Sequence, residues 1–199
     1  TDTVNKADHY NKEKEFVTFI GYEWSSLDSG HHNVYVKEHN IEDMDKIFTE
    51  EFTDFSFEMR KLLKKTDALL IPHVQSRMFP YLSLIQEKNE NGKSMTPVIE
   101  AYSDWGESIY PYSENADQDS LTGCMRTDHR AYLEALELGI DLGLISDSDT
   151  HTGLAGRTHP GSCAPDHDHP QGLTAVRADD LDRDNIFSGY QDKMTYGTT

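Results

Sequence analysis

The sequence has few cysteines, few basic residues and no long apolar run. Its two cysteines, Cys124 and Cys163, form at most one disulfide and leave the redox compartment open. Lys and Arg number 18 against 36 Asp and Glu, which gives a formal net charge of -18. A protein that binds nucleic acid by neutralising backbone phosphates needs the opposite balance, so we expect no nucleic-acid partner. No stretch of about 18 apolar residues is present, so we expect no membrane-spanning helix.

The sequence also lacks a signal-peptide pattern and the motifs of nucleophilic hydrolases. Thr1 opens a polar stretch without a basic region or an apolar region, so we expect a soluble chain. Its compartment, whether cytoplasmic, periplasmic or secreted, stays open. The sequence has no Gly-x-Ser-x-Gly elbow, no phosphate-cradling glycine loop and no Cys-x-x-Cys pair. Catalysis by a serine or cysteine nucleophile therefore has little support.

Apolar segments that are typical of strands alternate with amphipathic segments that are typical of helices. Strands are expected at residues 16–24, 33–36, 68–73, 97–102, 141–145 and 172–176, and helices at 55–65, 81–88, 128–138 and 182–190. The alternation predicts an α/β protein with a parallel sheet or barrel. A length of 199 residues fits a single domain over residues 1–199.

Several of the expected strands finish in a residue that can bind a metal ion. These residues are Glu23, His73, Glu100, Asp149 and His151. One such carboxylate is more often simply solvated, but the same placement at several strand ends is harder to attribute to coincidence. In barrel enzymes the side chains at the carboxyl ends of strands converge on the active site. Imidazole and carboxylate donors together suit Zn, Mn or Fe, whereas an oxygen-only set would suit Mg or Ca.

The segment Gly30 to Val34 contains two adjacent histidines. If the backbone there is extended, His31 and His32 project from opposite faces, so only one of them readily joins a given metal cluster. We favour His31 as the ligand and His32 as a substrate contact, and the order of the two stays open.

Six motifs follow one another along the chain: Phe-Ile-Gly-Tyr-Glu-Trp-Ser-Ser, Gly-His-His-Asn-Val-Tyr, Ile-Pro-His, Ile-Glu-Ala-Tyr-Ser-Asp-Trp-Gly, Leu-Ile-Ser-Asp-Ser-Asp-Thr-His-Thr-Gly and Gly-Leu-Thr-Ala-Val. Together they resemble the PHP (polymerase and histidinol phosphatase) superfamily, and most closely its uncharacterised branch of metal-dependent hydrolase proteins. The resemblance runs from about Phe16 to Thr199. None of the motifs is specific when taken alone.

The resemblance implies a distorted β/α barrel, seven-stranded in complete members, with two or three divalent metal ions at its mouth. Glu23 would then be a bridging ligand, His31 and His73 imidazole ligands, and Glu100 an acidic ligand. Asp149 and His151 would close the metal site and take part in catalysis. Three further residues are expected to face the negative charge of a small anionic substrate: His32, Arg77 and Arg157. Arginine suits that task because its planar group can bind two oxygens at once.

One departure from the family pattern is large, because the sequence has no His-x-His motif before Glu23. We therefore expect a partial barrel that lacks its first strands, from a chain cut short at both ends. The resemblance implies a metal-dependent hydrolase, specifically a phosphoesterase. Two alternatives stay open: a non-catalytic binding or structural module with a degenerate metal site, and a hydrolase of a non-phosphate ester or amide. The oligomeric state also stays open.

Overall fold

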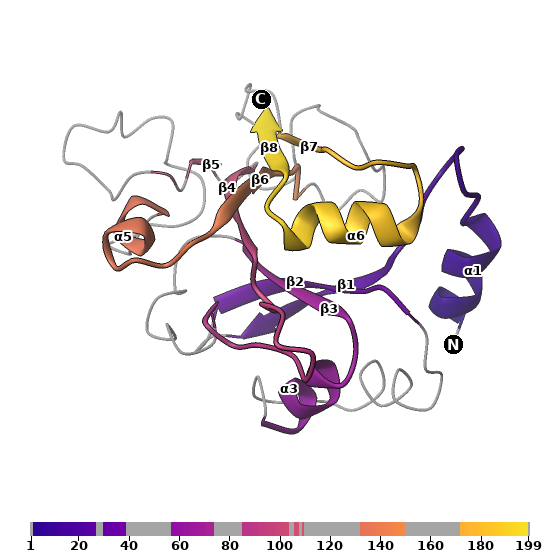
Figure 1. The fold of residues 1–199 in the computed structure, drawn as a ribbon, viewed down its shortest axis with the longest axis horizontal. Helices are drawn as coiled ribbons and strands as arrows, with labels where there is room; N and C mark the ends of the chain where they lie inside the picture. Colours follow the sequence, from indigo (N-terminus) through magenta and orange to yellow (C-terminus); the bar gives the residue numbers. More distant parts are fainter. Residues whose placement is uncertain are drawn as a thin grey trace.

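The structure is a computed structural model and describes residues 2–26, 30–38, 57–73, 85–103, 106–107, 109, 132–149 and 172–198. Figure 1 shows the elements in chain order: α1 (Asp2–Tyr10), β1 (Ile20–Ser26), β2 (Gly30–Val36), α3 (Phe57–Lys64), β3 (Ala68–His73), β4 (Val98–Ser103), β5 (Gly106–Glu107), α5 (Tyr132–Glu137), β6 (Gly143–Ser146), β7 (Leu173–Val176), α6 (Arg183–Gln191) and β8 (Thr195–Thr198). Of the helices in these ranges, none is both long and apolar enough to cross a membrane.

The described strands form three small sheets. Their orders are β1-β2-β3, β5-β4-β6 and β7-β8. Only the β4–β6 pair is parallel, whereas the other described pairs are antiparallel. Three residues separate β1 from β2, which is too few for the crossover that a parallel pair needs. Between β4 and β6 the chain has room for such a crossover and includes α5. The three sheets do not close on one another over the described residues, so the distorted barrel stays a prediction.

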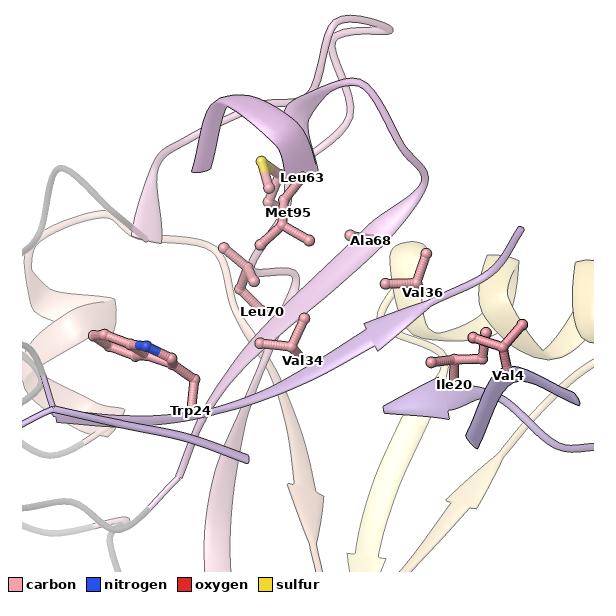
Figure 2. Close-up of a cluster of buried hydrophobic side chains, with 9 residues drawn as sticks. All are labelled: Val4, Ile20, Trp24, Val34, Val36, Leu63, Ala68, Leu70 and Met95. Carbon is pink, nitrogen blue, oxygen red and sulfur yellow. The ribbon is translucent and has the colours of Figure 1, made fainter. Parts of the chain in front are cut away.

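The β1–β3 sheet is buried on both faces. Every second residue of a strand lies on the same face, and register partners on neighbouring strands share that face. Val34 therefore packs with its register partner Leu70 and with Leu63 of α3 in one apolar cluster. Figure 2 shows that cluster, which also contains Val4, Ile20, Trp24, Val36, Ala68 and Met95. The opposite face carries Leu69 and Ile71, which pack against Phe187 of α6. Two-sided burial explains why these strands read as continuous apolar runs.

Helix α6 begins at a capping aspartate. The Asp182 carboxylate accepts a hydrogen bond from the backbone N–H of Asn185 at 2.7 Å and another from the Asn185 side-chain amide at 2.8 Å. These contacts satisfy a backbone donor that the first helical turn leaves without an intrahelical partner. The backbone N–H of Asn185, followed by its side-chain amide, holds the pKa of Asp182 below its ordinary value of 3.8.

Replacing Asp182 by alanine is expected to lower the midpoint of thermal unfolding by about 2–4 °C at neutral pH. Asp182→Asn should lose less, because its amide oxygen still accepts from Asn185. A carboxyl whose pKa is depressed in the folded state stabilises the protein fully at a pH above its unfolded-state pKa. This stabilisation is lost as the pH falls from the unfolded-state pKa through the folded-state pKa. The difference between wild type and Asp182→Ala should therefore shrink toward about pH 3. Equal midpoints of thermal unfolding for wild type and Asp182→Ala at neutral pH would show that the Asp182 cap does not stabilise the fold.

Candidate functional site

The first part of the site is an imidazole–carboxylate pair on the β1–β2 hairpin. The register sets Glu23 opposite Asn33 and Ser25 opposite His31, so Glu23 and His31 belong to the same face of the sheet. The His31 Nδ1 lies 2.8 Å from the Glu23 Oε1, and both side chains are about a third exposed. An ionised carboxylate only accepts hydrogen bonds, so Nδ1 is the donor. This tautomer puts the lone pair of His31 on Nε2, the nitrogen that would face a metal ion.

His73 joins this pair at the level of the backbone. It ends β3, and the register of β2 with β3 sets it directly opposite His31. Three residues that the sequence predicts as metal ligands, Glu23, His31 and His73, thus come from three adjacent strands at one end of the same sheet. The pairing of β2 with β3 creates this juxtaposition across 42 residues of sequence, since 73 minus 31 is 42.

His32 occupies the opposite face of β2, as the alternation of an extended strand requires. It is 3% exposed, and its ring centroid lies 6.2 Å from that of Trp24, its register partner on β1. The structure therefore places His32 in the packed interior, whereas His31 lies beside Glu23 on the partly exposed face. The roles of His31 as a metal ligand and of His32 as a substrate contact stay predictions.

The second part of the site is a group of acids where β4 and β6 run parallel. Because the strands are parallel, their carboxyl ends lie at the same edge, where Asp147 and Asp149 follow β6. Glu100 of β4 is 2% exposed, and Asp147, Ser103 and Asp149 lie in its surroundings. Burial, followed by the nearby charges of Asp147 and Asp149, raises the pKa of Glu100 well above its ordinary value.

Sequence reasoning missed Asp147. The signal that was present is its position, because it follows an apolar strand directly, as a ligand at a strand end would. The Asp147 backbone N–H donates to the Tyr102 carbonyl at 3.0 Å, which extends the β4–β6 contact by one residue and brings the two acids together.

Asp149 has a left-handed backbone, with φ of 49°. Residues other than glycine rarely adopt this backbone conformation. Asp and Asn tolerate it better than most because their short polar side chains can hydrogen-bond locally. The backbone therefore departs from the extended conformation of β6 at Asp149. His151, Arg77 and Arg157, which the sequence also predicts for the site, lie outside the described residues, so their predicted roles stay predictions.

The described side chains form two pairs: Glu23 with His31, and Glu100 with Asp147. Within the described part of the chain, no group of three or more His, Cys, Asp or Glu side chains is arranged to hold a metal ion. The donor types in the two pairs nevertheless fit Zn, Mn or Fe, which accept both imidazole and carboxylate. The carboxylates also supply the negative charge that a divalent cation requires.

One family model matches the first part of the chain. Its description is a protein of unknown function (DUF3604), and the match covers residues 1–83. The chain is therefore similar to that family over α1 through β3, the part that contributes Glu23, His31 and His73. Comparison with curated proteins found no match, and comparison with solved structures found none either.

Proposed function

We propose that this chain is a metal-dependent hydrolase and that its substrates are phosphoesters. The observation that carries the proposal is the close approach of Glu100 to Asp147 at the edge where Asp149 also lies. Burying a carboxyl beside a second acid costs free energy unless a proton or a cation neutralises the charge. A divalent cation is the neutralising group that also makes such a cluster useful for hydrolysis.

We assign the metal ligands to Glu23, His31, His73, Glu100, Asp149 and His151. The 2.8 Å contact with Glu23 supports the role of His31, because it fixes the orientation and the tautomer of the imidazole. Glu23 and His31 are partly exposed, so an ion from solution can reach them. Zn, Mn and Fe are the ions that suit this mixture of donors.

A pair of such cations, when bound, polarises a phosphoryl group and lowers the pKa of water from about 15.7 toward about 7. The protein supplies position and proton transfer. Asp149 is the group that we assign to accept a proton from the attacking water, since it follows β6 at the same edge as Glu100. Arg77 and Arg157 are assigned to the anionic oxygens of the substrate. Their charge and that of the metal would offset the acidity of the chain around a small anion.

The experiment is to load the chain with Mn or Zn, measure bound metal by elemental analysis and assay generic aryl phosphates. We expect at least about one tightly bound ion per chain and turnover that a chelator abolishes. His31→Ala should weaken metal affinity by about tenfold or more. His9→Ala is the matched control, because His9 lies exposed on α1 and stacks edge-on against Tyr10.

Two outcomes would contradict the proposal. Less than about one ion per chain would favour a non-catalytic module, because the proposed chemistry needs a metal pair. Metal binding without phosphate-ester turnover would favour hydrolysis of a non-phosphate ester or amide. That hydrolysis should not be inhibited by inorganic phosphate.

A further inference from the structure

A pocket of about 180 Å³ lies beside the acidic edge of β4 and β6. Its walls come from β2, β3, β6, β7 and α6, so it lies between the β1–β3 sheet and the elements that follow β6. Figure 1 shows α6 running along this side of the sheet, with β6, β7 and β8 close together beyond it. Ile71 and Ile145 form an apolar wall. Polar groups come from Tyr35, Tyr190, Asp147 and Ser148.

Two phenol side chains reach this pocket from segments 155 residues apart, since 190 minus 35 is 155. Over the described residues, neither the Tyr35 nor the Tyr190 hydroxyl makes a hydrogen bond to the protein. The Tyr35 ring lies tightly over Gly21, where an added Cβ would approach its Cδ1 to 2.8 Å. The lack of a side chain at Gly21 thus leaves the space that Tyr35 occupies. Thr174 also lines the pocket, but its hydroxyl is engaged with the Ser146 carbonyl at 2.6 Å.

The phenols act as hydrogen-bond donors at neutral pH. Burial, and then the charge of Asp147, raises the pKa of both Tyr35 and Tyr190, so both stay protonated. Asp147 lines the same pocket as both tyrosines. The oxygens of a carboxyl group accept hydrogen bonds, so Asp147 can accept from the hydroxyls of a ligand.

The charge of the pocket lining disfavours an anion. Among the described lining residues there is no Lys, Arg or His, and the one carboxyl is that of Asp147. A carboxylate or phosphate placed here would lie beside this carboxyl without a cationic side chain to balance its charge. A ligand for this pocket therefore needs groups that both accept from a phenol and donate to a carboxylate, and a hydroxyl does both.

We propose that this pocket binds a small, neutral, hydroxyl-rich group, with Tyr35 and Tyr190 donating to its oxygens and Asp147 accepting from its hydroxyls. A volume of about 180 Å³ leaves room for several water-sized groups, which suits a polyol or a monosaccharide. Ile71 and Ile145 would contact the carbon skeleton, as apolar walls do in most small-ligand sites. An ammonium group can donate to Asp147 and to the phenol oxygens, but it fits less well because it offers no acceptor to the two phenol O–H groups.

Binding of a polyol depends on the pocket residues alone and does not require a metal ion. A second step rests on the proposed function: Asp147 and Ser148 directly precede Asp149, so the pocket would accommodate the alcohol side of a phosphoester. The expected substrates are then phosphate esters of small polyols or sugars.

The test titrates the chain, in the presence of EDTA, with glycerol, erythritol, ribose and glucose, and follows binding by ligand-observed NMR. We expect at least one neutral polyol to bind with a Kd on the order of millimolar, as suits a few hydrogen bonds on a small ligand. Tyr35→Phe and Tyr190→Phe should each weaken this binding by about 3- to 10-fold. Neither change removes a hydrogen bond within the described structure, so the fold should persist, which thermal unfolding checks.

Tyr196→Phe is the matched control, because Tyr196 is 62% exposed on β8 and does not line the pocket. The proposal is overturned if no polyol binds, if the Tyr35→Phe/Tyr190→Phe double variant binds as wild type does, or if ethanolamine or inorganic phosphate binds more tightly than every polyol in EDTA. The two proposals can fail separately. If the chain binds a polyol in EDTA but shows no hydrolase activity after metal loading, the pocket proposal stands and only the proposed function is rejected.

Discussion

Replacing Asp149 by asparagine is expected to lower aryl-phosphate turnover by the metal-loaded chain about 100-fold or more. The change removes both a proposed metal ligand and the group assigned to take a proton from the attacking water, and a positioned acid–base group is worth about 10²–10⁴ in rate. Asparagine is a better choice than alanine because Asp149 has φ of 49°, a conformation that asparagine also tolerates. The loss can then be attributed to chemistry rather than to backbone strain.

The measurement is turnover at saturating substrate, together with metal content and the midpoint of thermal unfolding. Asp141→Asn is the matched control. Asp141 lies just before β6, at the end of the strand opposite Asp149, and its side chain is 85% exposed. The control should retain wild-type turnover. If Asp149→Asn also retains full turnover with an unchanged midpoint, Asp149 has no catalytic role and the hydrolase assignment loses its proposed base.

Replacing Glu100 by glutamine is expected to act in opposite directions on stability and on metal binding. In the metal-free protein the midpoint of thermal unfolding should rise by several degrees. A buried polar group without full compensation costs about 1–3 kcal/mol, and 1 kcal/mol corresponds to about 2–4 °C in a chain of this size. Glutamine has nearly the same shape, carries no charge and can donate to Asp147. The gain in midpoint on adding Mn or Zn should be smaller than in wild type, because a ligand is lost.

The pH dependence gives this prediction a sign that can be checked. The pKa of Glu100 is raised in the folded state, so its carboxyl destabilises the fold only above the unfolded-state value of 4.5, and more so as the pH rises toward the folded-state value. Wild type and Glu100→Gln should therefore have similar midpoints at about pH 4 and diverge toward neutrality. Glu90→Gln, on an exposed turn, should show no divergence. A lower midpoint for metal-free Glu100→Gln at neutral pH would show that the charged carboxyl stabilises the fold.

Local sequence signals located several elements well. The run Ala68–His73 is β3 as expected, because apolar β-favouring residues stop there at a proline and a histidine. Gly139 has φ of 75°, the left-handed conformation that a glycine after a helix commonly adopts, and it lies directly after the helix expected at residues 128–138. Helix α6 begins after the capping Asp182. Each of these features depends on residues within one or two turns of chain.

Features that depend on distant partners were less accessible from the sequence. The run 16–24 reads as one strand, but β1 begins at Ile20, and Phe16 is 60% exposed and forms an isolated bridge with Lys12. Apolar character alone does not show where pairing begins. The position of Asp147 directly after an apolar strand did not by itself single it out, because its approach to Glu100 requires β4 and β6 to pair in one register. The two tyrosines of the pocket meet only after α6 packs against the β1–β3 sheet.

Strand β2 sends successive side chains to opposite faces of the sheet: His32 and Val34 lie on one face, and His31 and Tyr35 lie on the other. Inserting or deleting a single residue within Gly30–Val36 would invert every side chain beyond the change, so that Val34 would replace Tyr35 at the pocket or His32 would replace His31 beside Glu23. A change in the length of this strand therefore displaces several of these side chains at once, whereas a substitution changes one. In any distant homologue that retains the same chemistry, the spacing between His31 and Tyr35 should be preserved together with the two residues.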